Sequence, residues 1–146
     1  MEVEIKLEPG RQEPKLVILT GELSEDIANL ARRLGSGESR FLPGYREGQV
    51  ILVEPGDIYR VYAQDQQVYA RLEGETVTLR ARLYELEERW KGTSIVRVSH
   101  SELVNFDKVK SLDLSITGTI SLRLTNGEST YVSRRYMGKI KDYLGI

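Results

Sequence analysis

Two consecutive arginines, Arg134 and Arg135, stand where a helix is predicted to begin. Ser133 precedes them and is a residue type that caps helices, and apolar residues follow at helical spacing. Exposed cations at the positive end of a helix dipole are mildly unfavourable, by about 0.3–1 kcal/mol each. The same terminus presents unpaired backbone N–H groups, so two arginines there would suit a phosphate or the edge of a guanine base. The alternative, that one of them pairs with a nearby carboxylate, is the commoner use of a surface arginine.

The single histidine, His100, lies just past a predicted strand in the sequence Val98-Ser99-His100-Ser101. The serines and Glu102 are its neighbours in sequence, which is not the geometry of a catalytic triad. One histidine and no cysteine exclude a two-histidine metal site, a thiolate zinc site and a cysteine nucleophile within the chain. The sequence also lacks a glycine-rich phosphate loop of the Walker or Rossmann type. We therefore predict a protein that is not an enzyme and that carries no metal and no cofactor.

The charge of the chain is unevenly distributed. The 146 residues carry 22 acidic and 21 basic side chains, a net charge of −1. Residues 1–90 hold 17 of the acidic and 12 of the basic side chains, a net −5, which leaves 5 and 9, a net +4, for residues 91–146. The second part is suited to attract a polyanion, although a segment of this charge is also common by chance. The acidic N-terminus has no apolar stretch of signal-peptide type, so we expect a cytoplasmic location.

The first 40 residues are predicted to form a β-β-α unit. Residues 3–7 alternate apolar and charged side chains and residues 16–19 are all apolar, and both patterns are typical of strands. Ser24 is a suitable helix cap, and apolar residues at helical spacing follow it up to Gly35. The small and polar residues at 35–39 predict a linker. Such a unit would pair two chains, dock a partner or cap the rest of the protein, and the sequence alone does not decide among these roles.

Residues 41–146 are predicted to contain short strands and two short helices. Apolar runs, alternation and turn residues predict strands or hairpins at 49–53, 58–63, 68–79, 95–98, 111–115, 119–125 and 129–132. Helical spacing predicts one helix at 81–90 and another from about Ser133. Asn126-Gly127 predicts a hairpin with a type I′ turn. The expected fold class is mainly β (α+β), with antiparallel strands.

The stretch from about residue 49 to residue 146 resembles the LytTR DNA-binding domain of bacterial transcription regulators. The resemblance rests on short motifs in a fixed order: Asp57-Ile58, Leu-Tyr-Glu-Leu at 83–86, Arg-Val-Ser-His-Ser-Glu-Leu-Val-Asn at 97–105, Val-Lys-Ser-Leu at 109–112 and Tyr-Val-Ser-Arg-Arg-Tyr at 131–136. The run at 97–105 is the most recognisable. The closing run to residue 146 is similar to that of small standalone regulators of the family.

The resemblance implies an elongated arrangement of short antiparallel strands that reads the major groove of DNA with loops. Three residues at matching positions are expected to approach base edges, namely Gln66, His100 and Arg135. Four others are expected near the phosphates, namely Arg97, Ser99, Ser101 and Arg134. The chemistry agrees, because arginine can donate two hydrogen bonds to guanine and glutamine can pair with adenine. Small hydroxyls and arginines suit phosphate oxygens.

The sequence departs from the family pattern in the most recognisable run. Many members have a histidine two residues before the serine, and here Ser99 fills that place while the histidine is His100. Glu102 stands where an aromatic or aliphatic residue is usual. A carboxylate near phosphates is unfavourable, so we expect Glu102 to turn away or to pair with a neighbour such as Lys108.

We therefore expect a sequence-specific transcriptional regulator that acts as a homodimer on a repeated double-stranded DNA site. Standalone regulators of this kind are often encoded beside a small membrane protein that restrains them, and such an inhibitor is a further expected partner. An alternative of a different class is a protein-interaction adaptor whose exposed strand edges add to a partner's sheet. The two hypotheses differ in whether positive electrostatic potential is concentrated at Gln66, His100 and Arg135 together.

Overall fold

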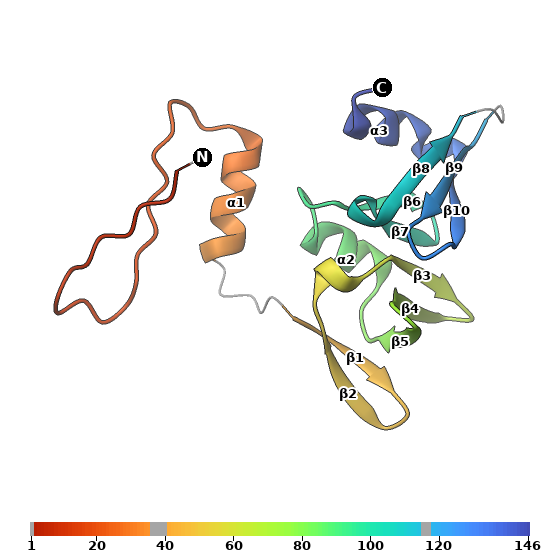
Figure 1. The fold of residues 1–146 in the computed structure, drawn as a ribbon, viewed down its shortest axis with the longest axis horizontal. Helices are drawn as coiled ribbons and strands as arrows, with labels where there is room; N and C mark the ends of the chain where they lie inside the picture. The colour runs from red at the N-terminus through yellow and green to blue at the C-terminus, as the bar shows by residue number, and fades with distance from the viewer. Residues whose placement is uncertain (1, 36–40, 115–117) are drawn as a thin grey trace. The chain divides into compact units, whose positions relative to one another are not determined.

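A computed structural model describes residues 2–35, 41–114 and 118–146 (Figure 1). The chain divides into two compact units, Met1–Ser36 and Gly37–Ile146. Of the predicted linker only Gly35 is described, as the last residue of a helix. The rest of that linker, and the predicted domain boundary after residue 40, lie outside the described residues.

The first unit contains the predicted helix but neither of the predicted strands. Helix α1 spans Glu25–Gly35, and the Ser24 hydroxyl accepts a hydrogen bond from the Ile27 amide at 3.2 Å, as expected of a cap. Residues 3–7 and 16–19 are not in strands, so the β-β part of the predicted β-β-α unit is wrong for this chain alone. The physical reason is that two short strands without a further strand or a packed helix are marginal in water.

The second unit is built from two antiparallel sheets. The larger has seven strands in the order β2-β1-β5-β4-β3-β7-β6, and the smaller has the order β10-β9-β8. The larger comprises β1 Leu42–Arg46, β2 Gln49–Val53, β3 Arg60–Gln64, β4 Gln67–Leu72, β5 Glu75–Leu79, β6 Ile95–Ser99 and β7 Glu102–Asn105. The smaller comprises β8 Val109–Asp113, β9 Ile120–Leu124 and β10 Ser129–Val132. The predicted mainly-β class with antiparallel strands is confirmed.

In the described part of the second unit, two α-helices and two short 3₁₀ helices accompany the sheets. Helix α2 spans Leu83–Arg89 and packs against β3, β6 and β7. Helix α3 spans Arg134–Leu144, directly after Ser133 as predicted, and packs against β6 and β10. The 3₁₀ helices are Pro55–Asp57 and Phe106–Lys108.

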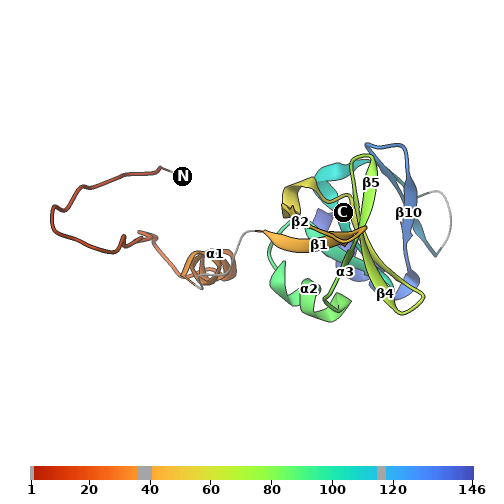
Figure 2. The same cartoon turned by 90° about the horizontal axis from the view of Figure 1, so that it is seen from below.

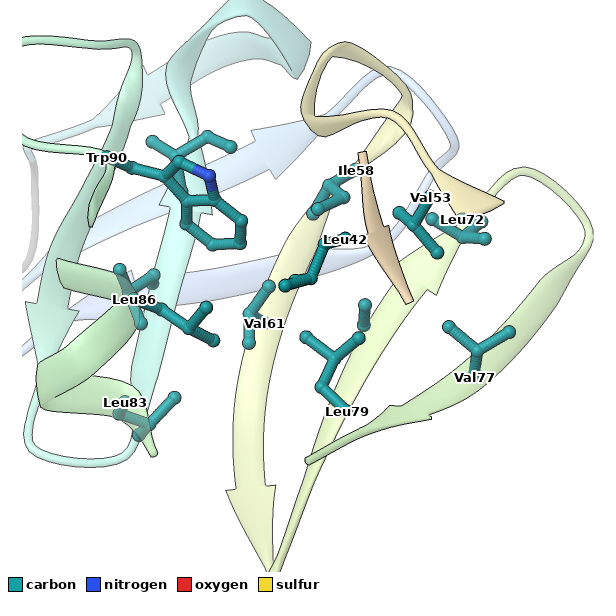
Figure 3. Close-up of a cluster of buried hydrophobic side chains, with 13 residues drawn as sticks. Leu42, Val53, Ile58, Val61, Leu72, Val77, Leu79, Leu83, Leu86 and Trp90 are labelled. Atoms are coloured by element: carbon teal, nitrogen blue, oxygen red, sulfur yellow. The ribbon is translucent and has the colours of Figure 1, made fainter. Parts of the chain in front are cut away.

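Each helix covers its own apolar core. The first core lies between α2 and the larger sheet (Figure 3), and includes Ile58, Val61, Leu79, Leu86, Trp90 and Leu103. The second lies under α3 and joins both sheets, with Val98, Val104, Ile120, Leu122, Val132 and Ile140 fully buried. Val98 and Val104 come from β6 and β7, so the larger sheet supplies part of the wall against which the smaller sheet packs.

The hairpin of β1 and β2 extends the larger sheet beyond β5 (Figure 2). Strand β1 passes so close to neighbouring side chains that only glycine fits at position 44. A Cβ atom at Gly44 would lie 2.8 Å from Cγ2 of Val77 and 2.9 Å from Cγ2 of Val53. These distances are too short for any side chain, so the absence of one lets β1 pass closely over the core.

The hairpin at Asn126-Gly127 forms, but the predicted type I′ turn is wrong. A type I′ turn needs positive φ at both central residues, and here Gly127 has φ +91° while Asn126 is not in the positive region. The Gly127 amide donates to the Leu124 carbonyl at 3.1 Å, and the Asn126 side chain accepts from the Glu128 amide at 3.0 Å. The loop therefore has three residues, a type I turn followed by a left-handed glycine.

Candidate nucleic-acid interface

The three loops that carry the expected base-contacting residues are joined to one another by backbone hydrogen bonds. The amide of Ala63, near the end of β3, donates to the carbonyl of Ser101 in the β6–β7 turn at 2.9 Å. The amide of Ser133, just before α3, donates to the carbonyl of Val98 in β6 at 3.0 Å. The β6–β7 turn is thus the middle member of the set, with the β3–β4 turn on one side and the start of α3 on the other.

Gln66 lies at the exposed tip of the β3–β4 hairpin in a backbone conformation that is unfavourable for its residue type. Gln64 pairs with Gln67, so the loop contains only Asp65 and Gln66, and their φ angles are +51° and +65°. Two positive φ angles define a type I′ turn, which asparagine and glycine adopt far more readily. Left-handed backbone costs roughly 1–2 kcal/mol for such a residue, and strained residues of this kind gather at functional sites.

His100 and Ser101 form an equally tight turn, and the buried side chain of Arg97 hydrogen-bonds to its backbone. Ser99 pairs with Glu102, and both turn residues are exposed. The guanidinium of Arg97 donates through Nε to the Ser99 carbonyl at 2.8 Å and through Nη2 to the His100 carbonyl. Arg97 is only 8% exposed. The Arg97 guanidinium therefore hydrogen-bonds to the backbone of the turn. A contact with a phosphate would need an exposed guanidinium.

Arg97 also connects this turn to both helices of the second unit. Its Nη1 lies 3.6 Å from the Glu87 carboxylate on α2, and the other oxygen of Glu87 lies 3.5 Å from Nζ of Lys139 on α3. Glu87 thus balances the buried charge of Arg97 and a surface charge of α3. The arrangement fixes the β6–β7 turn relative to the helix whose start carries Arg134 and Arg135.

Arg134 and Arg135 are both exposed, and within the part of the chain that the structure describes neither forms an ion pair. Ser133 occupies the cap position, yet its side chain makes no capping hydrogen bond. The carboxylate pairing considered from the sequence is therefore not seen. The Arg134 guanidinium lies against Gly118, where a Cβ would approach its Nε to 2.7 Å and where φ is +90°. The start of α3 presents two cations and backbone N–H groups together.

Glu102 does turn away from the loops, but its partner is Arg60 rather than Lys108. Nε of Arg60 donates to the Glu102 carboxylate at 3.2 Å, and Glu102 is 8% exposed. The ammonium of Lys108 instead lies over the ring of Tyr59, 5.1 Å from its centre. The expected neighbour is thus wrong, because Arg60 on β3 reaches Glu102 diagonally across the β3–β7 pair, in which Arg60 lies opposite Val104 and Glu102 opposite Tyr62.

The same arginine begins an ion-pair network that joins the two sheets. Arg60 lies 3.1 Å from the carboxylate of Glu128, which follows the β9–β10 turn, and Nε of Arg71 on β4 donates to Glu128 at 2.8 Å. Burial opposes ionisation of Glu128. Hydrogen bonds from Arg71 and Asn126, and the charges of Arg60 and Arg71, outweigh it and hold the pKa of Glu128 below its usual value.

The positioning residues Arg60, Glu87 and Glu128 were not predicted from the sequence. Each is a charged residue whose partner lies far away along the chain, and no spacing rule indicates such pairs. Among the described residues, no group of histidine, aspartate and glutamate is arranged to hold a metal ion. No helix in the described ranges is long and apolar enough to cross a membrane.

A family model, the LytTr DNA-binding domain, matches residues 48–145 of the chain. A solved LytTr DNA-binding domain, from a putative methyl-accepting/DNA response regulator of Bacillus cereus, is similar in structure, with a TM-score of 0.71. The two chains are 25% identical, and the similarity covers 75% of this chain and all of that one. The family match runs from β2 to α3, and β1 and the first unit lie outside it.

Curated relatives of similar length are named as uncharacterized HTH-type transcriptional regulators of Staphylococcus aureus. One is 26% identical over 147 residues, covering 100% of this chain and 99% of its own length. Another, from a different strain, is 32% identical over 109 residues, covering 75% of this chain and 74% of its own. The sensory transduction protein LytT of Enterococcus faecalis is 27% identical over 109 residues, which are 45% of its length. In the present structure strands β6 to β10 lie between α2 and α3 along the chain. These two helices are therefore not joined by a short turn, as the helices of a helix-turn-helix motif are.

Proposed function

Because this chain belongs to the LytTR family and is a DNA-binding transcriptional regulator, we propose that it reads specific sequences in the major groove through three loops. The observation that carries the proposal is the pair of backbone hydrogen bonds that join these loops. Ala63 to Ser101 connects the β3–β4 and β6–β7 turns, and Ser133 to Val98 connects the latter to α3. One rigid scaffold thus presents Gln66, His100 and Arg135 from three separate parts of the sequence.

We propose distinct contacts for the exposed and half-buried residues of this surface. Arg135 would donate two hydrogen bonds to guanine, Gln66 would pair with adenine, and His100 would meet a third base edge. Ser99, Ser101 and Arg134 would contact phosphates, together with the backbone N–H groups at the start of α3. Arg97 was expected among the phosphate contacts, and its burial supports a positioning role instead.

The regulator would act in the cytoplasm as a homodimer on a repeated site. Two copies on two half-sites would double the number of base contacts and raise the specificity of binding. A small membrane-protein inhibitor is a further proposed partner, and it rests on the resemblance alone. We propose a binding role without catalysis.

The test is a fluorescence-anisotropy titration of the purified full chain with the DNA upstream of its own gene. We expect Arg135→Ala to weaken specific binding by about 1–3 kcal/mol and to relax the preference at one base position. Arg123→Ala removes an exposed arginine from the middle of β9 and is the matched control, which should bind as the wild type does. Equal affinity of the Arg135→Ala variant and the wild type would contradict the assignment of Arg135.

A second candidate function, an adaptor that adds strands to a partner's sheet, is favoured by one observation. Strand β2 is an edge of the larger sheet, and its Val50 and Leu52 side chains are 61% and 68% exposed. Open apolar edges are sites for strand addition. Well-folded protein that shows no competitor-resistant binding to any upstream DNA would move the assignment to this function.

A further inference from the structure

The first unit exposes an unusual amount of apolar surface. Within its segment before α1, the side chains of Val3, Ile5 and Leu7 are 83%, 85% and 89% exposed. Further exposed side chains in the unit are Leu16, Val17, Leu19, Leu23 and Leu34. Single exposed apolar residues need no explanation, but a concentration of them in one short segment marks a surface that another body covers. The family match leaves this unit unexplained, because it begins at residue 48.

The segment at residues 3–7 has the pattern of a strand without having a partner strand. Its apolar and charged side chains alternate, which places the three apolar residues on one face and Glu4 and Lys6 on the other. The ammonium of Lys6 lies 4.0 Å from the Glu4 carboxylate, as expected for charged neighbours on one face of an extended segment. A strand of this kind needs a second strand to satisfy its backbone N–H and C=O groups.

The charges of the segment are complementary to a second copy of the same segment. If two copies run antiparallel about a twofold axis at Ile5, Glu4 of each lies opposite Lys6 of the other, and Val3 lies opposite Leu7. Opposite charges and apolar pairs in directly facing positions stabilise an antiparallel pair. Glu8 lies beyond this pairing, and within the chain Nε of Arg11 neutralises it at 2.8 Å.

We propose that residues 3–7 of two chains pair as antiparallel strands and that this pairing is the dimer interface of the regulator. The inference rests on the homodimer of the proposed function and identifies the segment that forms it. The apolar face of the strand pair would be covered by the apolar stripe of α1, which includes Ile27, Leu30 and Leu34. A two-stranded pair is marginal in water, and a covering helix from each chain supplies the packing that makes it stable.

The first test uses the lack of cysteine in the chain, which makes any introduced thiol unique. In the proposed register Ile5 faces Ile5 of the second copy, so full-length Ile5→Cys should form a disulfide-linked dimer on mild oxidation. Glu4→Cys is the matched control, because each new thiol would face Lys6 and lie about 7–8 Å from its own counterpart. Crosslinking that is equal at the two positions would overturn the register.

The second test exchanges the charges and measures mass by light scattering over a range of concentrations. Lys6→Glu should raise the dimer dissociation constant roughly tenfold, since it converts two attractive pairs into two repulsive ones. Adding Glu4→Lys to it should restore the wild-type value. The proposal would be overturned if the wild-type chain stays monomeric at all concentrations or forms higher oligomers. It would also be overturned if neither substitution alters the dimer dissociation constant. Anisotropy on a single half-site, which needs no dimer, shows separately whether the DNA-reading surface is intact.

Discussion

At the scale of single residues, Arg97 was expected to contact a phosphate, and its place in the structure supports a positioning role instead. Its guanidinium joins two turn carbonyls and the Glu87 carboxylate while being almost fully buried. Arg97→Lys keeps the positive charge but loses the fork that reaches both carbonyls. We expect the variant to bind specific DNA about tenfold more weakly, because the His100 turn loses its support. Circular dichroism and thermal unfolding provide the control that the domain remains folded.

The salt dependence of binding separates this positioning role from a phosphate contact. The logarithm of the binding constant falls with the logarithm of salt by about 0.9 for each phosphate that is neutralised. Arg97→Lys should leave that slope unchanged. A slope reduced by about one would instead place the Arg97 guanidinium on DNA.

Arg134→Ala should behave in the opposite way. Its guanidinium is exposed beside Gly118, and we propose that it contacts a phosphate. Loss of one such contact should reduce the salt slope by about one and weaken binding to specific and random DNA alike. An anisotropy titration at several salt concentrations measures both quantities. Loss of affinity for the specific site alone would indicate that Arg134 reads a base.

The sequence predicts where a local element begins better than it predicts contacts between distant segments. The start of α3 was placed correctly because Ser133 and the apolar spacing after it are local signals. The ion-pair partners of Arg97 and Glu102 were not predicted. An ion pair between distant segments depends on strand register, which one sequence does not determine. The strained turn at Gln66 likewise has no local signature, since glutamine is not a turn-forming residue.

At the scale of elements, Glu128 ties the β9–β10 hairpin to the larger sheet through Arg60 and Arg71. Its pKa in the folded protein lies below the ordinary value of 4.5, so near that pH the unfolded chain binds more protons than the folded one. The stability that Glu128 contributes is therefore present above about pH 4.5. It is lost as the pH falls through the lower pKa of the folded state.

We accordingly expect Glu128→Gln to lower the free energy of unfolding at pH 7 and to make little difference at the acidic end of the folded range. Urea unfolding of the wild type and the variant across this pH range measures the difference. Glu88→Gln is the control, because Glu88 is exposed on α2 and has no ion pair in the described part of the chain. A Glu128→Gln difference that is independent of pH would show that the network does not depend on the carboxylate charge.

The elements themselves show where local patterns suffice and where they do not. Strands β2 and β10 have the predicted bounds, since an apolar run that ends at turn residues marks the first and the Asn126-Gly127 turn precedes the second. Strand β7 was missed because all four of its residues are buried, including Glu102, so it shows no alternation. Residues 3–7 have the alternation of a strand and yet form none, because the pattern describes a face to be buried and not the partner that buries it.

At the scale of the whole molecule, two DNA-reading surfaces gain from being linked. If residues 3–7 join two chains, the second chain binds a neighbouring half-site at a high effective concentration. A DNA carrying two half-sites should then be bound at least 10²-fold more tightly than one carrying a single half-site. The gain should depend on the spacing of the half-sites, because both surfaces must face the same side of the duplex.

Lys6→Glu tests this coupling without touching the DNA-reading surface. The substitution lies in the first unit, outside the residues matched by the DNA-binding family. Since it weakens the proposed strand pair, we expect the affinity for the double site to fall towards that for a single half-site, while the single-site affinity stays unchanged. The charge-exchanged variant with Glu4→Lys should recover the gain. If Lys6→Glu lowers both affinities equally, residues 3–7 support the folded DNA-binding domain and do not link two copies of it.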